Sequence, residues 1–101
     1  MISEKAFATQ VEDLLDMFGW TWVHFRPART KHGWTTAMSG TKGFPDYVAA
    51  REIHPDEFQR IFFELKKENG KLSSEQEVWV RLLNAYVWRP SQIKEIAKIL
   101  R

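Results

Sequence analysis

The chain has 101 residues, of which 44% are hydrophobic and 28% are charged, a composition typical of one soluble globular domain. No apolar run approaches the roughly 18 residues that span a bilayer, and acidic residues break the first apolar run, so we expect no secretory leader. The absence of cysteine excludes disulfides and cysteine zinc sites. The net charge of +2 is too small to indicate a nucleic-acid partner by itself.

The N-terminal residues have the pattern of an amphipathic helix over 4–18. Ser3 is a suitable N-cap, and Gly19 suits the helix end. The apolar residues recur at three- and four-residue spacing and form one stripe, which consists of Phe7, Val11, Leu14, Leu15 and Phe18.

Alternating residues predict a strand over 20–26, with Trp20, Trp22 and His24 on one face. The two tryptophans on this face suggest a dimer surface as one interpretation. His24 has no histidine partner at metal-ligand spacing, so we interpret it as a residue at the edge of a groove.

Residues 27–43 show no periodicity and contain no acidic residue. A structureless loop of this length is unusual in a small domain unless it binds something or moves. One interpretation is a DNA-contacting flap, with cations on phosphates and an aromatic ring on the bases or groove; these residues are Arg26, Arg29, Lys31, Trp34 and Lys42. The other is a solvated loop whose Trp34 packs against the core.

Residues 43–66 hold two segments rich in aromatic and β-branched residues, separated by the polar turn 54–57. They predict a β-hairpin with Asp46 at the start of its first strand. Because side chains alternate along a strand, Glu64 and Lys66 share one face of the second strand, and the other face is apolar.

The remaining residues predict a helix, a short strand and a last helix. The first of these helices starts at Ser73 or Ser74 in a capping box, and its apolar side consists of Val78, Leu82, Leu83 and Tyr86. Residues 86–88 predict the strand. We expect Ser91 to cap the last helix, whose inward residues are Ile93, Ile96, Ala97 and Leu100. The predicted order is α-β-β-β-α-β-α, an α/β arrangement in which helices flank a mixed sheet.

The hairpin carries the residues with the clearest chemistry. Two carboxylates beside a lysine (Asp46, Glu64 and Lys66) suit a hard divalent cation and an attacking water. Two other interpretations remain open: Asp46 is a turn residue at the strand entrance, and Glu64 is exposed on an edge strand in an ordinary ion pair with Lys66. A buried Glu64 would be costly unless paired or metal-bound.

This ordered set resembles the PD-(D/E)xK nuclease signature, with Pro45-Asp46 followed by Glu64-x-Lys66. The wider context is similar to the VRR-NUC branch, the virus-type replication and repair nucleases; its elements are Gly43 to Asp46, Glu64 to Lys66, Gly70 to Ser73, Gln76 and Trp79. The resemblance covers most of the chain, 1–101 being one domain, and implies a restriction-endonuclease-like core.

The resemblance implies a metal-dependent DNA endonuclease that hydrolyses phosphodiester bonds in branched, flap or duplex DNA during phage or host replication, recombination and repair. Asp46 and Glu64 would hold Mg²⁺ or Mn²⁺ with the backbone carbonyl of Leu65, and Lys66 would orient the water or stabilise the transition state. It also implies the cytoplasm of a bacterial or phage-infected cell, with a homodimer as one arrangement.

The family adds a glutamine and a glutamate to the site. The glutamine maps to Gln76. The glutamate, a catalytic residue and metal ligand, maps to Glu4 near the start of the first helix, with Glu12 as the alternative. The rival to an enzyme is a non-catalytic DNA-binding or structural module that retains the nuclease fold, which would cleave no strand.

Overall fold

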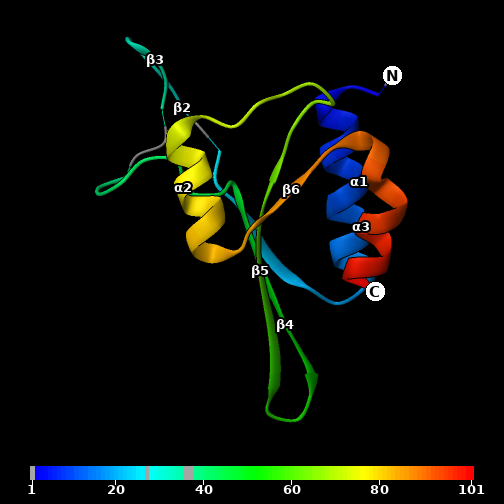
Figure 1. Cartoon of the computed structure of the whole chain (residues 1–101). Coiled ribbons are helices and arrows are strands. Elements are labelled where there is room, and N and C mark those ends of the chain that lie inside the picture. Colours follow the sequence, from blue (N-terminus) through cyan, green and yellow to red (C-terminus); the bar gives the residue numbers. More distant parts are fainter. Residues whose placement is uncertain (1, 27, 36–37) are drawn as a thin grey trace.

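Four strands form a mixed sheet in the order β1-β4-β5-β6, in which β5 and β6 are parallel and the other pairs antiparallel. The computed structural model describes residues 2–26, 28–35 and 38–101. The protein is therefore a mixed α/β domain (Figure 1). Its elements are α1 (Glu4–Met17), β1 (Thr21–His24), β2 (Ala28–Thr30), β3 (Gly33–Thr35), β4 (Tyr47–His54), β5 (Glu57–Leu65), α2 (Ser74–Leu83), β6 (Tyr86–Trp88), a 3₁₀ turn (Pro90–Gln92) and α3 (Ile93–Leu100).

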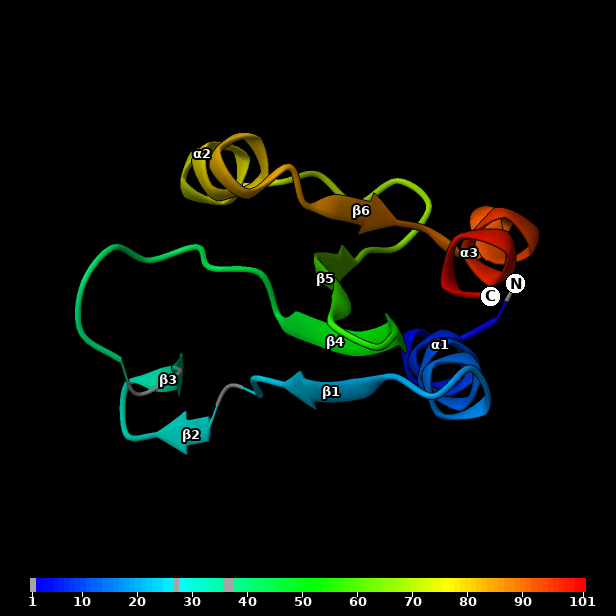
Figure 2. The same cartoon turned by 90° about the horizontal axis from the view of Figure 1, so that it is seen from below.

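Helices α1 and α3 lie side by side on one face of the sheet, and α2 lies on the other side (Figure 2). The core lies between the sheet and the α1–α3 pair, and its most buried residues are Phe7, Val11, Leu15, Tyr47, Phe63, Ile96 and Leu100. The predicted stripe of the first helix is confirmed, because Phe7, Val11 and Leu15 are buried and the other two residues are partly buried against the core. Ser3 caps α1 by accepting from the amide of Ala6.

The predicted hairpin is present as β4 and β5, joined at Pro55 and Asp56. Asp56 has a φ of 68°, a left-handed conformation that aspartate tolerates in turns. The outer part of the hairpin extends well beyond the helices (Figure 1). Its inner part pairs with β1 on one edge and β6 on the other. The residues just before β4 and just after β5 therefore lie near each other, at the end of the hairpin opposite its turn.

Three expectations about aromatic and apolar residues are wrong or incomplete. Trp20 is only 6% exposed, and its indole donates to the Leu100 carbonyl, so it cannot form a dimer surface. Trp22 also packs against the core and donates to Asp16. On α2, Val78 and Leu82 are 51% and 75% exposed, because this helix covers only part of its side of the sheet and none of its ten residues is fully buried.

Two further expectations about local structure are wrong. The segment from residue 27 to 43 is not devoid of regular structure, since β2 and β3 form a separate two-stranded sheet. Ser91 does not cap the last helix; it lies in the 3₁₀ turn and donates its amide and hydroxyl protons to Glu68. Among the described residues, no helix is long and apolar enough to span a membrane.

Candidate active site

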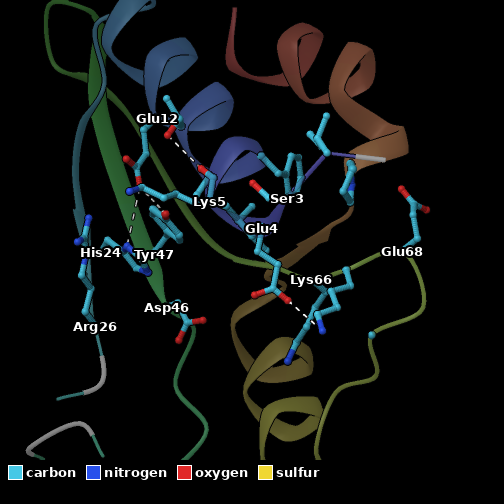
Figure 3. Close-up of a pocket in the computed structure, with 18 of the residues that line it drawn as sticks. Ser3, Glu4, Lys5, Glu12, His24, Arg26, Asp46, Tyr47, Lys66 and Glu68 are labelled. Atoms are coloured by element: carbon cyan, nitrogen blue, oxygen red, sulfur yellow. Dashed lines mark hydrogen bonds and ion pairs between the residues drawn. The ribbon is translucent and has the colours of Figure 1, made fainter. Parts of the chain in front are cut away.

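A pocket of about 1080 Å³ opens at the end of the sheet where α1 begins (Figure 3). Its walls come from the first half of α1, the end of β1, the residues before β4 and the segment after β5. The polar residues that line it include Ser3, Glu4, Lys5, Glu12, His24, Arg26, Asp46, Lys66, Lys67 and Glu68.

Asp46 lines this pocket, and Glu64 is buried close enough for the charge of Asp46 to act on it. The hairpin register pairs Tyr47 with Phe63, so continuing it by one residue sets Asp46 opposite Glu64. Side chains opposite each other in an antiparallel pair are roughly 5 Å apart at Cβ. After burial, the charge of Asp46 is the second cause that raises the pKa of Glu64, which agrees with this proximity.

Glu64 is fully buried, with 0% of its surface exposed. Its Oε1 accepts from Nε2 of Gln76 at 3.2 Å, and its Oε2 has no hydrogen-bond partner among the described residues. Burial, and then the charge of Asp46, raise the pKa of Glu64 to about 7. The interpretation of Glu64 as an exposed ion-pair partner is therefore wrong.

Asp46 is held at the pocket by its backbone. Its carbonyl accepts from the Phe25 amide at 2.7 Å, and the preceding Pro45 is fully buried. Burial raises the pKa of the Asp46 carboxyl, while the charges of His24 and Lys66 lower it. Asp46 is thus a half-buried carboxylate fixed to the end of β1, rather than a residue of a freely exposed turn.

Gln76 connects the charged residues of the site. Its Oε1 accepts from Nζ of Lys66 at 3.1 Å and from the Ser73 amide at 2.9 Å, and its Nε2 donates to Glu64. The Ser73 hydroxyl accepts from the Gln76 amide, which completes the predicted capping box. The Gln76 side chain therefore caps the N-terminus of α2, accepts from the Lys66 ammonium and donates to one of the two Glu64 carboxylate oxygens.

The N-terminus of α2 is docked closely against the segment before Asp46. Gly43 has a φ of 93°, and a Cβ at this position would lie 2.7 Å from the backbone carbon of Glu75. Trp79 adds a hydrogen bond of 2.9 Å to the Lys42 carbonyl and an edge contact with Phe44. The glycine before Phe44-Pro45-Asp46 thus allows Gln76 to reach the site.

The two candidate glutamates of α1 lie in different surroundings. Glu4 is on the pocket rim, 67% exposed, and forms an ion pair of 3.5 Å with Lys67. Glu12 is deeper, and its Oε2 accepts from the Tyr47 hydroxyl at 2.5 Å and lies 3.8 Å from Nδ1 of His24 (Figure 3). The structure thus brings both to the pocket and gives only Glu12 a buried partner.

Sequence reasoning missed the pair formed by Tyr47 and Glu12. Burial, and then the hydrogen bond to Glu12, raise the pKa of Tyr47 well above its ordinary value, so the hydroxyl stays protonated. His24 stacks on Tyr47 with centroids 4.1 Å apart. Its pKa is lowered by burial and by the charge of Arg26. The only sequence signal was the position of Tyr47 directly after Asp46.

The expected DNA-contacting residues are only partly described. Arg26, Lys31 and Lys42 are exposed, and Arg26 lines the pocket. The backbones of Arg29 and Trp34 lie in β2 and β3, but their side chains lie outside the described part of the chain.

The donor set fits a hard cation with few protein ligands. In the described ranges, no three His, Asp or Glu side chains converge as a metal-binding group, so a cation would use the two carboxylates together with water and the Leu65 carbonyl. Mg²⁺ commonly keeps several waters in this way. The unpartnered Oε2 of the buried Glu64 is the feature that favours such a ligand.

Comparison with known proteins does not identify the chain. No protein-family model, curated protein or solved structure matches it.

Proposed function

We propose that this protein is a metal-dependent DNA endonuclease of the VRR-NUC type within the PD-(D/E)xK nucleases, with a restriction-endonuclease-like core. The observation that carries the proposal is the buried Glu64, which has an unpartnered oxygen, lies opposite Asp46 and is linked through Gln76 to Lys66. A purely structural role explains poorly why a carboxylate with a pKa of about 7 is kept in this position.

The charges of the site favour a dication. Burial raises the pKa of both Asp46 and Glu64, which means that the fold disfavours two ionised carboxylates here. Lys66 offsets this in part, but its ammonium is engaged by Gln76. Mg²⁺ or Mn²⁺ would be held by Asp46, Glu64 and the carbonyl of Leu65.

When bound, the metal would lower the pKa of an attacking water and neutralise charge on the phosphoryl oxygens. Lys66 would face the same phosphate, and its ammonium would stabilise the charge that develops there. Gln76 would hold Lys66 in position through Oε1. Water would attack phosphorus and lose a proton to solvent, the bond to one ester oxygen would break, and that oxygen would take up a proton from solvent as it leaves.

The substrate we propose is DNA, in branched or flap form. Exposed cations on both sides of the pocket support it, with Arg26 at the end of β1 and Lys67 and Lys71 after β5. Lys31, between β2 and β3, and Lys42, before β4, are further exposed cations that would belong to this surface. Arg29 and Trp34, whose side chains lie outside the described part of the chain, stay part of the proposal. The protein would act in replication and repair in the cytoplasm of a bacterial or phage-infected cell, and a homodimer remains part of the proposal.

The test is incubation of labelled duplex, flap and four-way DNA with the purified protein in Mg²⁺ or Mn²⁺. We expect cleavage that EDTA abolishes and that Asp46→Ala and Glu64→Ala lack while remaining folded by circular dichroism. The matched control is Glu52→Ala, which removes a carboxylate from the outer hairpin and should cleave like wild type. Cleavage by the two site variants at the wild-type rate would refute the assignment, and salt-sensitive DNA binding without cleavage would favour a non-catalytic DNA-binding module.

A further inference from the structure

A row of aromatic rings in contact crosses all four strands on the face covered by α1 and α3. His24 stacks on Tyr47 at 4.1 Å between centroids and Tyr47 stacks on Phe63 at 4.7 Å, while Phe63 contacts Trp88 at 4.5 Å with the ring planes tilted by 34°. The planes differ by 8° at each of the first two steps. Because Tyr47 lies between two nearly parallel rings, its ring has room to shift mainly within its own plane.

The two candidate carboxylates are attached to neighbouring rings of this row. Asp46 directly precedes Tyr47, Glu64 directly follows Phe63, and Tyr47 and Phe63 are register partners. Glu64 is held by its hydrogen bond from Gln76 on α2. The Phe25 amide anchors the Asp46 carbonyl, and Tyr47 is the next residue in the chain, so displacement of Tyr47 would disturb the placement of the Asp46 side chain relative to Glu64.

Glu12 is the group that fixes Tyr47 within its plane. The hydroxyl at the end of the Tyr47 ring donates to Glu12 Oε2 at 2.5 Å. Glu12 lies on α1, which is packed into the core by Val11 and Leu15, both 0% exposed. The hydrogen bond thus joins the ring to a rigid helix, and it occupies the same Glu12 oxygen that lies near His24.

We propose that Glu12 is a positioning residue, which acts through Tyr47 to hold Asp46 opposite Glu64 and does not itself bind the metal. This inference rests on the proposed function. It assigns the two glutamates of α1 different roles, since within the described part of the chain Glu4 forms an ion pair with Lys67 and has no such link to the carboxylate pair.

The experiment measures Mn²⁺ binding, by the paramagnetic resonance signal of free Mn²⁺, alongside cleavage of flap DNA. Tyr47→Phe keeps the stacked ring and removes only the hydroxyl, and we expect it to weaken Mn²⁺ binding by roughly 10- to 100-fold, as losses of outer hydrogen bonds around metal sites do. Glu12→Ala should have the same effect, and the double variant should be no weaker than either single one. Glu12→Gln keeps an acceptor oxygen and should restore binding to near the wild-type value.

The matched control is Asp16→Ala, which removes a different hydrogen bond between α1 and the sheet, that of 2.8 Å from Trp22 on β1. It should bind Mn²⁺ like wild type when every variant is measured well below its melting temperature. If Glu12→Ala does not fold, the Mn²⁺ affinities of Tyr47→Phe and Glu12→Gln test the inference without it.

Two results would overturn the inference while leaving the proposed function intact. One is wild-type Mn²⁺ affinity in Tyr47→Phe, with Asp46→Ala still unable to bind. The other is loss of binding in Glu12→Gln with normal binding in Tyr47→Phe, which would make Glu12 a ligand. A wild-type protein that neither binds Mn²⁺ nor cleaves DNA would instead refute the proposed function, and the inference with it.

Discussion

Gln76 donates its side-chain amide to Glu64 over 3.2 Å, so the helix that follows the hairpin provides the hydrogen bond of a fully buried carboxylate. The second oxygen of Glu64 has no partner among the described residues. Burial and the charge of Asp46 disfavour the ionised form of this half-satisfied carboxylate and raise its pKa to about 7 in the metal-free protein, which leads to the first prediction.

Metal-free stability should fall as the pH rises from about 4.5 to about 7. The pKa of Glu64 rises from 4.5 in the unfolded chain to about 7 in the fold, so the native state binds more protons in this window and is stabilised below it. The loss due to Glu64 is at most about 3 kcal/mol. Urea unfolding in EDTA across this pH range should show the fall in the free energy of unfolding of wild type. The contribution of Glu64 to this pH dependence should be absent in Glu64→Gln. Parallel profiles for the two proteins would contradict the assignment.

Divalent metal should raise the melting temperature of wild type. A cation that binds only the native state at about ten times its Kd adds roughly 1.4 kcal/mol, which for a domain of this size is about 5–10 °C. Mn²⁺ should do at least as well as Mg²⁺. Thermal melts at matched ionic strength would measure this, with Asp46→Ala as the control that should show no rise.

Lys66→Ala should cleave DNA far more slowly than wild type, and Lys66→Arg should not restore the rate. The ammonium donates to Gln76 Oε1 at 3.1 Å, and a guanidinium differs from it in size and geometry. Lys71→Arg, which makes the same substitution at another lysine lining the pocket, is the control for the larger size of the arginine side chain. Single-turnover rates would separate the chemical step from DNA binding, and full activity in Lys66→Arg would exclude this role for the ammonium.

Neutralising Arg26, Arg29, Lys31 and Lys42 together should flatten the dependence of DNA affinity on salt. Each lost phosphate contact lowers the slope of log K against log salt by about 0.9 on duplex DNA. Filter binding or fluorescence anisotropy over a salt series would measure the slope. An unchanged slope in the quadruple variant would assign this segment to solvent, and Trp34→Ala would then be expected to affect stability rather than binding.

Gly43→Ala should destabilise the protein more than Gly40→Ala, by on the order of 1–3 kcal/mol. Both glycines have positive φ values, 93° and 97°, but only a Cβ at Gly43 would collide with the backbone of α2, and one at Gly40 would meet nothing within 4 Å. Urea unfolding gives the two values. Gly43→Ala should also weaken Mn²⁺ binding, because it displaces Gln76; equal effects of the two changes would contradict the close docking of α2.

Local signals in the sequence predicted much of this arrangement. The turn at Pro55 and Asp56 separates two apolar segments, which is sufficient to predict the hairpin, and Ser73 three residues before Gln76 predicted the capping box that the structure contains. Alternation along β5 predicted that Glu64 points away from the apolar face of Phe63, but not that α2 and β6 would bury it.

The features that were missed depend on long-range contacts or on very short elements. Trp20 is buried because it meets Leu100, 80 residues later in the chain, and the Tyr47–Glu12 hydrogen bond spans 35 residues. Strands β2 and β3 have three residues each, too few to show a period. The apolar spacing of Val78 and Leu82 is helical, but spacing alone does not reveal whether another element covers that side.

The parallel pairing of β5 with β6 has a consequence for the order of folding events. A hairpin with a two-residue turn forms in roughly 1–10 μs, whereas β6 can join only after the α2 crossover has formed. Asp46 and Glu64 would thus come into register while still in water, and desolvation of Glu64 would follow when β6 docks. The strain of the metal-free site would therefore arise late, so raising the pH should speed unfolding more than it slows refolding.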